Sequence, residues 1–142
     1  MKILVIDGPN LNMLGERNPG IYGTESLETI HDYMQEKFRE VSFEFFQSNH
    51  EGQLIDKIHD SFGSVDALII NPGAFTHYSI ALRDAVEFQR IPVVEVHLTN
   101  IFAREEFRNR SVISPVCTGV ISGFGKNSYL LAVHALIHEL RK

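Results

Sequence analysis

Two kinds of hydrophobic pattern alternate along this chain. Short apolar runs, mostly ended by Gly, Pro, Asn or His, are typical of strands buried on both faces of a sheet. Between them, apolar residues recur every three or four positions, which is the period of an amphipathic helix. The predicted strands cover residues 3–6, 42–47, 67–70, 92–96 and 118–122. The predicted helices cover residues 27–41, 54–62, 76–88 and 129–140, with a further short helix over 100–108.

Polar residues mark the ends of some of these helices. Ser26 directly precedes the first helical pattern and is predicted to be its N-cap. Ser48 and Glu51 have the spacing of a capping box at the start of the second helix. Gly63 is predicted to end that helix.

The order of the elements predicts the fold class. Strands that alternate with helices are parallel and are joined by right-handed crossovers. Five such strands within 142 residues predict an α/β flavodoxin-like three-layer sandwich with a parallel sheet of order 2-1-3-4-5. There is no linker, repeat or low-complexity segment, so residues 1–142 are expected to form a single domain.

A long polar loop follows the first strand. Residues 8–23 contain four glycines and two prolines, together with Asn10, Arg17 and Tyr22. Loops of this length in a compact domain usually bind, cover or move. Ligands of open α/β sheets bind beyond the carboxyl ends of the strands, so this loop is expected at the binding crevice.

Other polar residues also stand at the carboxyl ends of predicted strands, and these ends meet at one edge of the sheet. They are Asp7 and Asn10, Asn71, and the pair Glu95 and His97. Two residues apart on a strand, Glu95 and His97 are predicted on the same face. A carboxylate beside an imidazole fixes its tautomer and favours its charged form, which suits proton transfer. An ordinary buried His–Glu pair is the alternative interpretation.

Composition narrows the class of partner and compartment. The net charge is −5 and no basic block is present, which argues against nucleic acid. The first strand begins at once, and no apolar run is long enough for a membrane span, so we expect neither a signal peptide nor a membrane anchor. Cys117 stands alone, which excludes an internal disulfide and suggests the cytoplasm. Its apolar neighbours predict an inert, buried thiol.

Motifs for cofactors are missing from the sequence. Neither glycine-rich nucleotide motif, G-x-G-x-x-G or G-x-x-x-x-G-K-[ST], is found, and H-E-x-x-H is absent. His134 and His138 have an i, i+4 spacing, but Ala135 replaces the glutamate of that zinc motif. Histidines that cap, pack or face water are the favoured interpretation there, so no metal or other cofactor is expected.

Five blocks of the sequence resemble the type II 3-dehydroquinate dehydratases of the shikimate and quinate pathways. The match runs from the first strand into the last helix, and the blocks that carry it are GPNLNMLGERNPGIYG, FFQSNHEGQLID, INPGAFTHYSIALRDA, VVEVHLTNIFAREEFR and SPVCTGVISGFG. The resemblance implies a hydro-lyase that converts 3-dehydroquinate to 3-dehydroshikimate. It implies an anti elimination through an enolate, without a metal or a Schiff base.

The same resemblance implies roles for catalytic residues. Tyr22 matches the base that removes the proton next to the ketone. A free tyrosine has a pKa of about 10, and Arg17 and Arg108 match cations that favour its ionised form. Asn10 matches the residue that holds the enolate. His97 matches the acid that protonates the leaving hydroxyl, with Glu95 as its partner.

The remaining matched residues are implied in substrate binding and assembly. Asn71, His77 and Arg108 match contacts to ring hydroxyls. Leu98 and Thr99 match the carboxylate site, with Thr99 where many relatives carry Ser. Asp84 matches a residue that reaches the site of a neighbouring subunit, which implies trimers, usually four in a dodecamer. Arg104, in the same block as Arg108, is expected to order the lid or form an ion pair.

A binding module remains a second hypothesis on the residues alone. A flavodoxin-like receptor for a small polyhydroxylated acid would also have the loop, the arginines and the crevice. The pairs Tyr22/Arg17 and Glu95/His97 favour the enzyme, because a receptor does not need groups for proton transfer.

Overall fold

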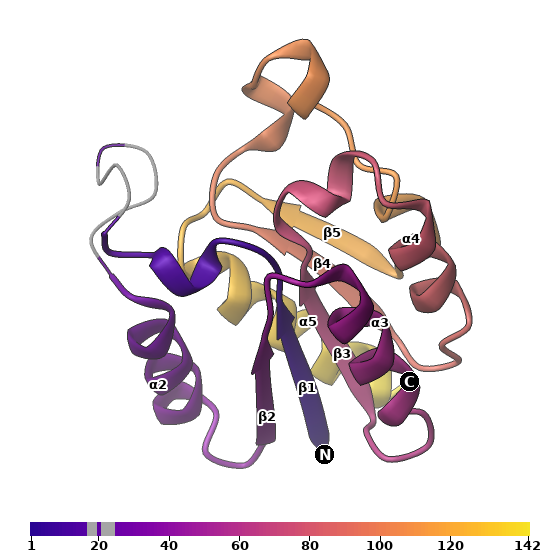
Figure 1. Cartoon of the computed structure of the whole chain (residues 1–142). Helices are drawn as coiled ribbons and strands as arrows, with labels where there is room; N and C mark the ends of the chain where they lie inside the picture. Colours follow the sequence, from indigo (N-terminus) through magenta and orange to yellow (C-terminus); the bar gives the residue numbers. More distant parts are fainter. Residues whose placement is uncertain (17–19, 21–24) are drawn as a thin grey trace.

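Five parallel strands form the centre of the molecule. We analysed a computed structural model that describes residues 1–16, 20 and 25–142. The sheet has the order β2-β1-β3-β4-β5, and every neighbouring pair is parallel. This confirms the predicted flavodoxin-like α/β fold (Figure 1). The strands are β1 (Lys2–Asp7), β2 (Ser42–Gln47), β3 (Ala67–Asn71), β4 (Val93–His97) and β5 (Gly119–Ser122).

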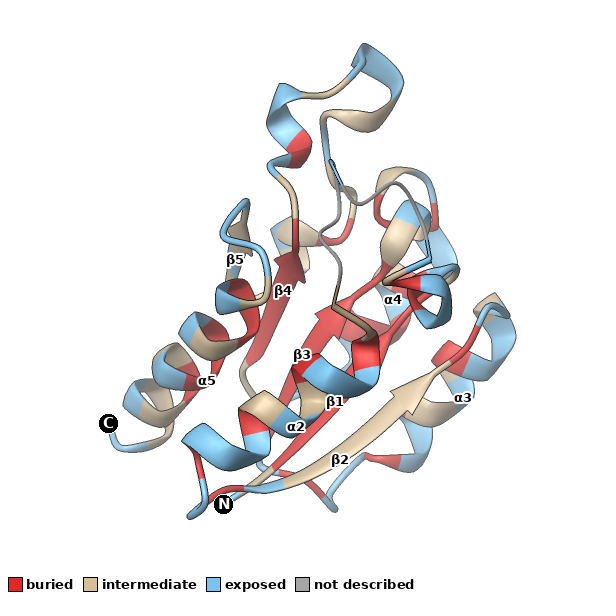
Figure 2. Ribbon diagram, turned by 90° about the vertical axis from the view of Figure 1, so that its left-hand side faces the viewer, coloured by how far each residue is buried: buried red, intermediate tan, exposed pale blue. Residues whose placement is uncertain are grey.

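Helices cover both faces of this sheet and give two apolar cores. The helices α2 (Leu27–Lys37) and α5 (Asn127–Leu140) pack on one face, and α3 (Glu51–Asp60) and α4 (Ile80–Glu87) pack on the other. Successive residues of a strand alternate between the faces. Ile3 and Val5 therefore belong to the core with α2 and α5, whereas Leu4 and Ile6 belong to the core with α3 and α4. In Figure 2 the central strands β1, β3 and β4 are buried, while β2 at the edge is partly exposed.

Short 3-10 turns, rather than longer helices, form much of the carboxyl edge. They are η1 (Leu11–Met13), η2 (Gly73–His77), η3 (Ile101–Ala103), η4 (Glu106–Arg108) and η5 (Ser114–Val116). The predicted helix over 100–108 is thus two separate turns, which form the orange excursion at the top of Figure 1. The predicted helix over 76–88 begins at residue 80, because Ser79 caps it by accepting from the Leu82 N–H.

Some predicted helix ends are correct and others are wrong. Ser26 caps α2 by accepting from the Thr29 N–H, as predicted. The capping box at Ser48 does not form, because the N-cap of α3 is His50 and not Ser48. The Ser48 hydroxyl instead accepts from the His50 N–H and donates to Gln53. Three apolar residues within the predicted helix ranges 54–62 and 76–88 are exposed: Phe62 by 57 %, Ile80 by 56 % and Phe88 by 74 %.

The ends of β1 and β3 approach so closely that only glycine fits at position 8. The Gly8 N–H donates to the carbonyl oxygen of Asn71 at 2.7 Å. A Cβ atom at Gly8 would lie 2.4 Å from the carbonyl oxygen of Pro72, which is backbone and has no freedom to turn away. This contact fixes the start of the long loop against the turn after β3.

Gly8→Ala is therefore expected to lower the free energy of unfolding by about 1–3 kcal/mol, the usual cost of overpacking. Urea unfolding measures the change. Gly52→Ala is the matched control, because a Cβ atom at this position in α3 meets nothing within 4 Å. It should raise stability by about 0.5–1 kcal/mol. Equal effects of the two substitutions would contradict the close approach at Gly8.

Candidate active site

A pocket opens at the carboxyl edge of the sheet, where the sequence predicted a crevice. Its walls come from the segments that follow three neighbouring strands, β1, β3 and β4. The lining residues are Pro9, Asn10, Leu11, Asn71, Gly73, Ala74, His77, His97, Leu98, Thr99, Ile101, Arg104 and Arg108. Seven of the predicted site residues are among them: Asn10, Asn71, His77, His97, Leu98, Thr99 and Arg108.

His97 and Glu95 form a buried pair at the end of β4. The Glu95 carboxylate is fully buried and His97 is almost so. His97 Nε2 is bonded to Glu95 Oε2. This contact leaves Nδ1 as the ring nitrogen for proton exchange with a molecule in the pocket. The prediction that both side chains share one face is confirmed.

Three hydroxyl groups hold the carboxylate of Glu95 from behind. Thr76 donates to Oε2 at 2.8 Å, and Ser111 and Ser114 each donate to Oε1 at 2.9 Å. Burial by itself raises the pKa of Glu95. The hydrogen bond and the charge of His97, together with the hydroxyl donors, lower it by more than burial raises it, so the pKa lies below its usual value. The carboxylate therefore stays ionised beside the imidazole. Sequence analysis missed these hydroxyls, which come from separate loops.

His77 reaches the pocket from η2 and is held as a neutral ring. Its Nδ1 donates to the carbonyl oxygen of Arg110 at 2.7 Å. Burial lowers the pKa of His77, and the nearby charges of His97, Arg104 and Arg108 lower it further, against the raising effect of the Arg110 bond. Nε2 is then available as an acceptor for a ligand hydroxyl.

The lowered pKa of His77 makes stability depend on pH. Its pKa lies below the 6.5 of the unfolded state, so on acidification the unfolded chain takes up a proton first and stability falls. The Glu95 pKa is also lowered, so its contribution is present above 4.5 and is lost as the pH falls through the lower folded value. We expect the urea midpoint to fall between about pH 7 and pH 5, and less so in His77→Asn. An identical fall in both proteins would contradict this assignment.

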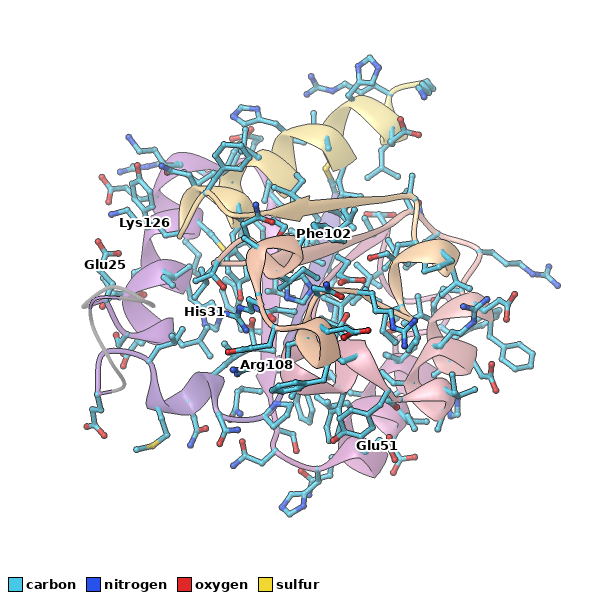
Figure 3. All side chains as sticks on the ribbon, turned by 90° about the horizontal axis from the view of Figure 1, so that it is seen from above. Glu25, His31, Glu51, Phe102, Arg108 and Lys126 are labelled. Atoms are coloured by element: carbon cyan, nitrogen blue, oxygen red, sulfur yellow. The ribbon has the colours of Figure 1, made fainter. Side chains whose placement is uncertain are left out.

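Two arginines follow β4 and line the pocket. Arg104 donates to the Thr99 hydroxyl. Arg108 makes a bidentate contact with Glu105, with Nε and Nη2 at 2.8 and 2.9 Å from its oxygens. In Figure 3, seen from above, Arg108 and Phe102 lie on the excursion over this edge of the sheet. Arg104, expected to order the lid or form an ion pair, is thus also a wall of the pocket.

Asn10 and Asn71 are placed by the backbone around them. Asn10 has a left-handed conformation, with a φ of 70°, and its N–H is bonded to Asn49 Oδ1 at 2.9 Å. Such a conformation is well tolerated by Asn. Asn71 is buried, and its amide is bonded to Tyr129 and to the N–H of Gly73. Asn71 is thus the last residue of β3, and Asn10 lies in the turn that follows β1.

Several predicted residues lie elsewhere. Tyr22 and Arg17 fall outside the described residues. Asp84 is exposed on α4 and is not among the pocket residues of its own chain. Asp7 also does not line the pocket, but lies beneath it in contact with Tyr129 and His31.

The sequence also led to predictions about the Cys117 thiol, about metal binding and about membrane-spanning segments. Burial raises the pKa of Cys117 to about 12, in agreement with an inert thiol. Among the residues that the structure describes, no three His, Cys, Asp or Glu side chains gather in a way that could hold a metal ion. His134 packs edge-on against Phe38. Within the same ranges no helix combines the length and the apolar character needed to cross a bilayer.

The fold and the site together define a class of α/β enzyme with an imidazole, backed by a buried carboxylate, at the carboxyl edge of its sheet. The profile of the family described as dehydroquinase class II matches residues 1–137. The chain belongs to this family.

Individual relatives agree with that membership. A 3-dehydroquinate dehydratase of Caldicellulosiruptor bescii is 59 % identical over 138 residues, which are 95 % of each chain. The crystal structure of type II dehydroquinase from Butyrivibrio crossotus matches with a TM-score of 0.94 and 48 % identity, over 96 % of this chain and 97 % of the other. The type II dehydroquinase of Propionibacterium acnes gives a TM-score of 0.91 and 42 % identity, over 95 % and 94 %.

Proposed function

We propose that this chain dehydrates 3-dehydroquinate to 3-dehydroshikimate. The proposal is supported by membership of the class II dehydroquinase family and by relatives that carry the name 3-dehydroquinate dehydratase. The observation that carries it is the His97–Glu95 pair at the wall of the pocket, because this pair is an acid with its own charged partner. A module that only binds its ligand has no need of it.

The proposed reaction has two steps and uses no metal or imine. The Tyr22 phenolate, favoured by the charge of Arg17, removes the proton next to the ketone. The C–H electron pair moves toward the ketone oxygen, and Asn10 holds the resulting enolate. The enolate then returns its electrons to form the C=C bond, the C–O bond on the opposite face breaks, and His97 gives its proton to the leaving oxygen, which departs as water. The roles of Tyr22 and Arg17 rest on the resemblance of their motif.

The remaining pocket residues are proposed to bind the substrate. The backbone N–H groups of Leu98 and Thr99, with the Thr99 hydroxyl, would receive its carboxylate. Asn71, His77 and Arg108 would hold its ring hydroxyls. All of these residues line the pocket, where donors and acceptors match an acid that carries several hydroxyls.

The family resemblance supports wider proposals about assembly and setting. Residues 1–142 would form one catalytic domain, and Asp84, exposed on α4, would complete the site of a neighbouring subunit. Four trimers would then make a dodecamer, and particle mass in solution tests this number. The enzyme is proposed to act in the cytoplasm, either in the shikimate pathway of aromatic amino acid biosynthesis or in quinate catabolism.

The direct test is to mix the purified chain with 3-dehydroquinate and to follow the ultraviolet absorbance of the conjugated product. A rise in absorbance that requires the protein is expected, and a flat trace would favour the binding module. Borohydride added together with the substrate should leave the activity intact. Irreversible inactivation would instead indicate an imine, and would overturn the proposed enolate route.

A further inference from the structure

A row of buried polar side chains lies beneath the pocket, on the face of the sheet that α2 and α5 cover. Asp7 ends β1 and Asn71 ends β3, and the two residues are directly paired in the sheet register. They share this face because they alternate in step with Val5 and Ile69, which pack in the core of α2 and α5. Asp7 therefore interrupts an apolar face with a carboxylate that the proposed reaction does not use.

Tyr129, in the first turn of α5, joins the two strand ends. Its hydroxyl lies 2.6 Å from Asp7 Oδ1 and 3.0 Å from Asn71 Nδ2. Asp7 and Tyr129 are fully buried and Asn71 is almost so. On the other side of the carboxylate, His31 Nε2 lies 3.0 Å from Asp7 Oδ2. His31 comes from α2 and is labelled in Figure 3.

The direction of each hydrogen bond in this row is determined. The Gly73 N–H donates to Asn71 Oδ1 at 3.2 Å, so the amide nitrogen of Asn71 must face Tyr129. Tyr129 accepts there and gives its single proton to Asp7, whose carboxylate accepts. Burial and the charge of Asp7 raise the pKa of Tyr129 well above its usual value, so the phenol retains this proton. The donors thus all point the same way, from Gly73 to Asp7.

We propose that Asp7 and Tyr129 are positioning residues that fix the orientation of the Asn71 amide in the pocket. The row occupies one N–H and one lone pair of Asn71, which leaves one donor and one acceptor for a ligand in set places. A flipped amide would exchange the two and place N–H₂ against the N–H of Gly73. The row therefore decides which partner, a hydroxyl hydrogen or a lone pair, the substrate must present at each side of Asn71.

An apolar residue at position 7 would continue the core without the cost of a buried charge. A carboxylate at this position gives the row an end that only accepts, so the Tyr129 proton points away from Asn71 and the phenol oxygen accepts from the Asn71 amide. Asp7 and Tyr129 thus hold the nitrogen end of the amide, while the Gly73 N–H holds its oxygen end. The inference rests on the proposed function only where it takes Asn71 to contact the substrate.

The test is a double-mutant comparison of steady-state kinetics with 3-dehydroquinate. Tyr129→Phe removes the hydroxyl and should raise KM roughly three- to tenfold, the loss of one buried hydrogen bond, with kcat changed less than about twofold. In an Asn71→Ala background the same substitution should leave KM unchanged, since the residue on which it acts is gone. An equal rise in both backgrounds, or no rise in either, would overturn the proposal.

A second variant covers the case in which Tyr129→Phe does not fold. Asp7→Asn keeps the volume but lets either end of the new amide face Tyr129, so the Tyr129 proton is no longer held away from Asn71 and only the Gly73 N–H still orients the Asn71 amide. It should raise KM about two- to fivefold in the parent and not in the Asn71→Ala background. Tyr33→Phe is the matched control on α2, where the ring lies under Lys126 and Lys37. It loses the same atom and should not change KM.

Hydrogen exchange separates this proposal from the proposed function. The Gly73 N–H is bonded to the Asn71 side chain, so in Tyr129→Phe or Asp7→Asn it should exchange several times faster, whether or not the chain turns over substrate. Absence of turnover with faster exchange would refute the proposed function and support the positioning role of Asp7 and Tyr129. Normal turnover with unchanged exchange would support the function and refute that positioning role.

Discussion

His97→Asn is expected to lower kcat for 3-dehydroquinate by about 10²- to 10⁴-fold, the range for loss of a general acid. His97 lines the pocket, and its Nε2 is engaged by the fully buried Glu95. Asparagine still offers an N–H to this carboxylate, so the buried charge keeps a partner and the fold should persist. What is lost is the proton for the leaving hydroxyl. Steady-state rates measure the change, with circular dichroism to confirm folding.

The matched control and a partial reaction make this test specific. His59→Asn changes an exposed histidine of α3 and should leave kcat unchanged. Because His97 acts after the enolate has formed, His97→Asn should still exchange the proton next to the ketone with deuterium from D₂O. Tyr22→Phe should lose this exchange as well as turnover. If His97→Asn lost the exchange and Tyr22→Phe kept it, the two roles would have to be reversed.

Glu95→Gln is expected to lower kcat by about 10²-fold or more, by analogy with the carboxylate of a catalytic triad. Both oxygens of Glu95 accept hydrogen bonds, from His97 and Thr76 on one side and from Ser111 and Ser114 on the other. A glutamine must turn its N–H₂ toward one of these sides, where donors already point. The imidazolium of His97 also loses the charge that stabilises it.

This substitution should also destabilise the fold by about 1–3 kcal/mol, because buried donors are left unpaired. Turnover and urea unfolding are measured on the same preparation. Glu51→Gln is the control, since Glu51 accepts a hydrogen bond from the Ser79 hydroxyl at 2.5 Å and the side-chain oxygen of glutamine can do the same. It is the first residue of α3 and is not among the residues that line the pocket; Figure 3 labels it. A Glu95→Gln enzyme with normal kcat would show that His97 needs no charged partner.

Several features of the site followed from local pattern. The strands and helices were predicted because their hydrophobic patterns are local properties of the sequence, and the sheet order followed from the fold class that their alternation indicates. The convergence of Asn10, Asn71 and His97 on one edge followed from the fold class. The side-by-side placement of Glu95 and His97 followed from the alternation of a strand.

Other features were outside the reach of such patterns. The turns η2, η3 and η4 replaced predicted helix because apolar spacing does not distinguish one turn of 3-10 helix from the start of an α-helix. The apolar residues Ile80 and Phe88 match the helical period, yet they are exposed in this chain. The periodicity shows only that apolar residues lie on one face, and it does not say what covers that face.

The sequence by itself determined the strands and helices, the family, and which polar residues stand at strand ends, since each is recognised from contiguous stretches of the chain. Only the tertiary structure decided which of those residues touch. Thr76, Ser111 and Ser114 meet Glu95 from two loops, and Tyr129 meets Asp7 across 122 positions. Buried polar groups must find partners wherever the folded chain brings a donor within about 3 Å. These partners come together only in the folded chain, and the distance between two residues along the sequence does not indicate whether they will pair.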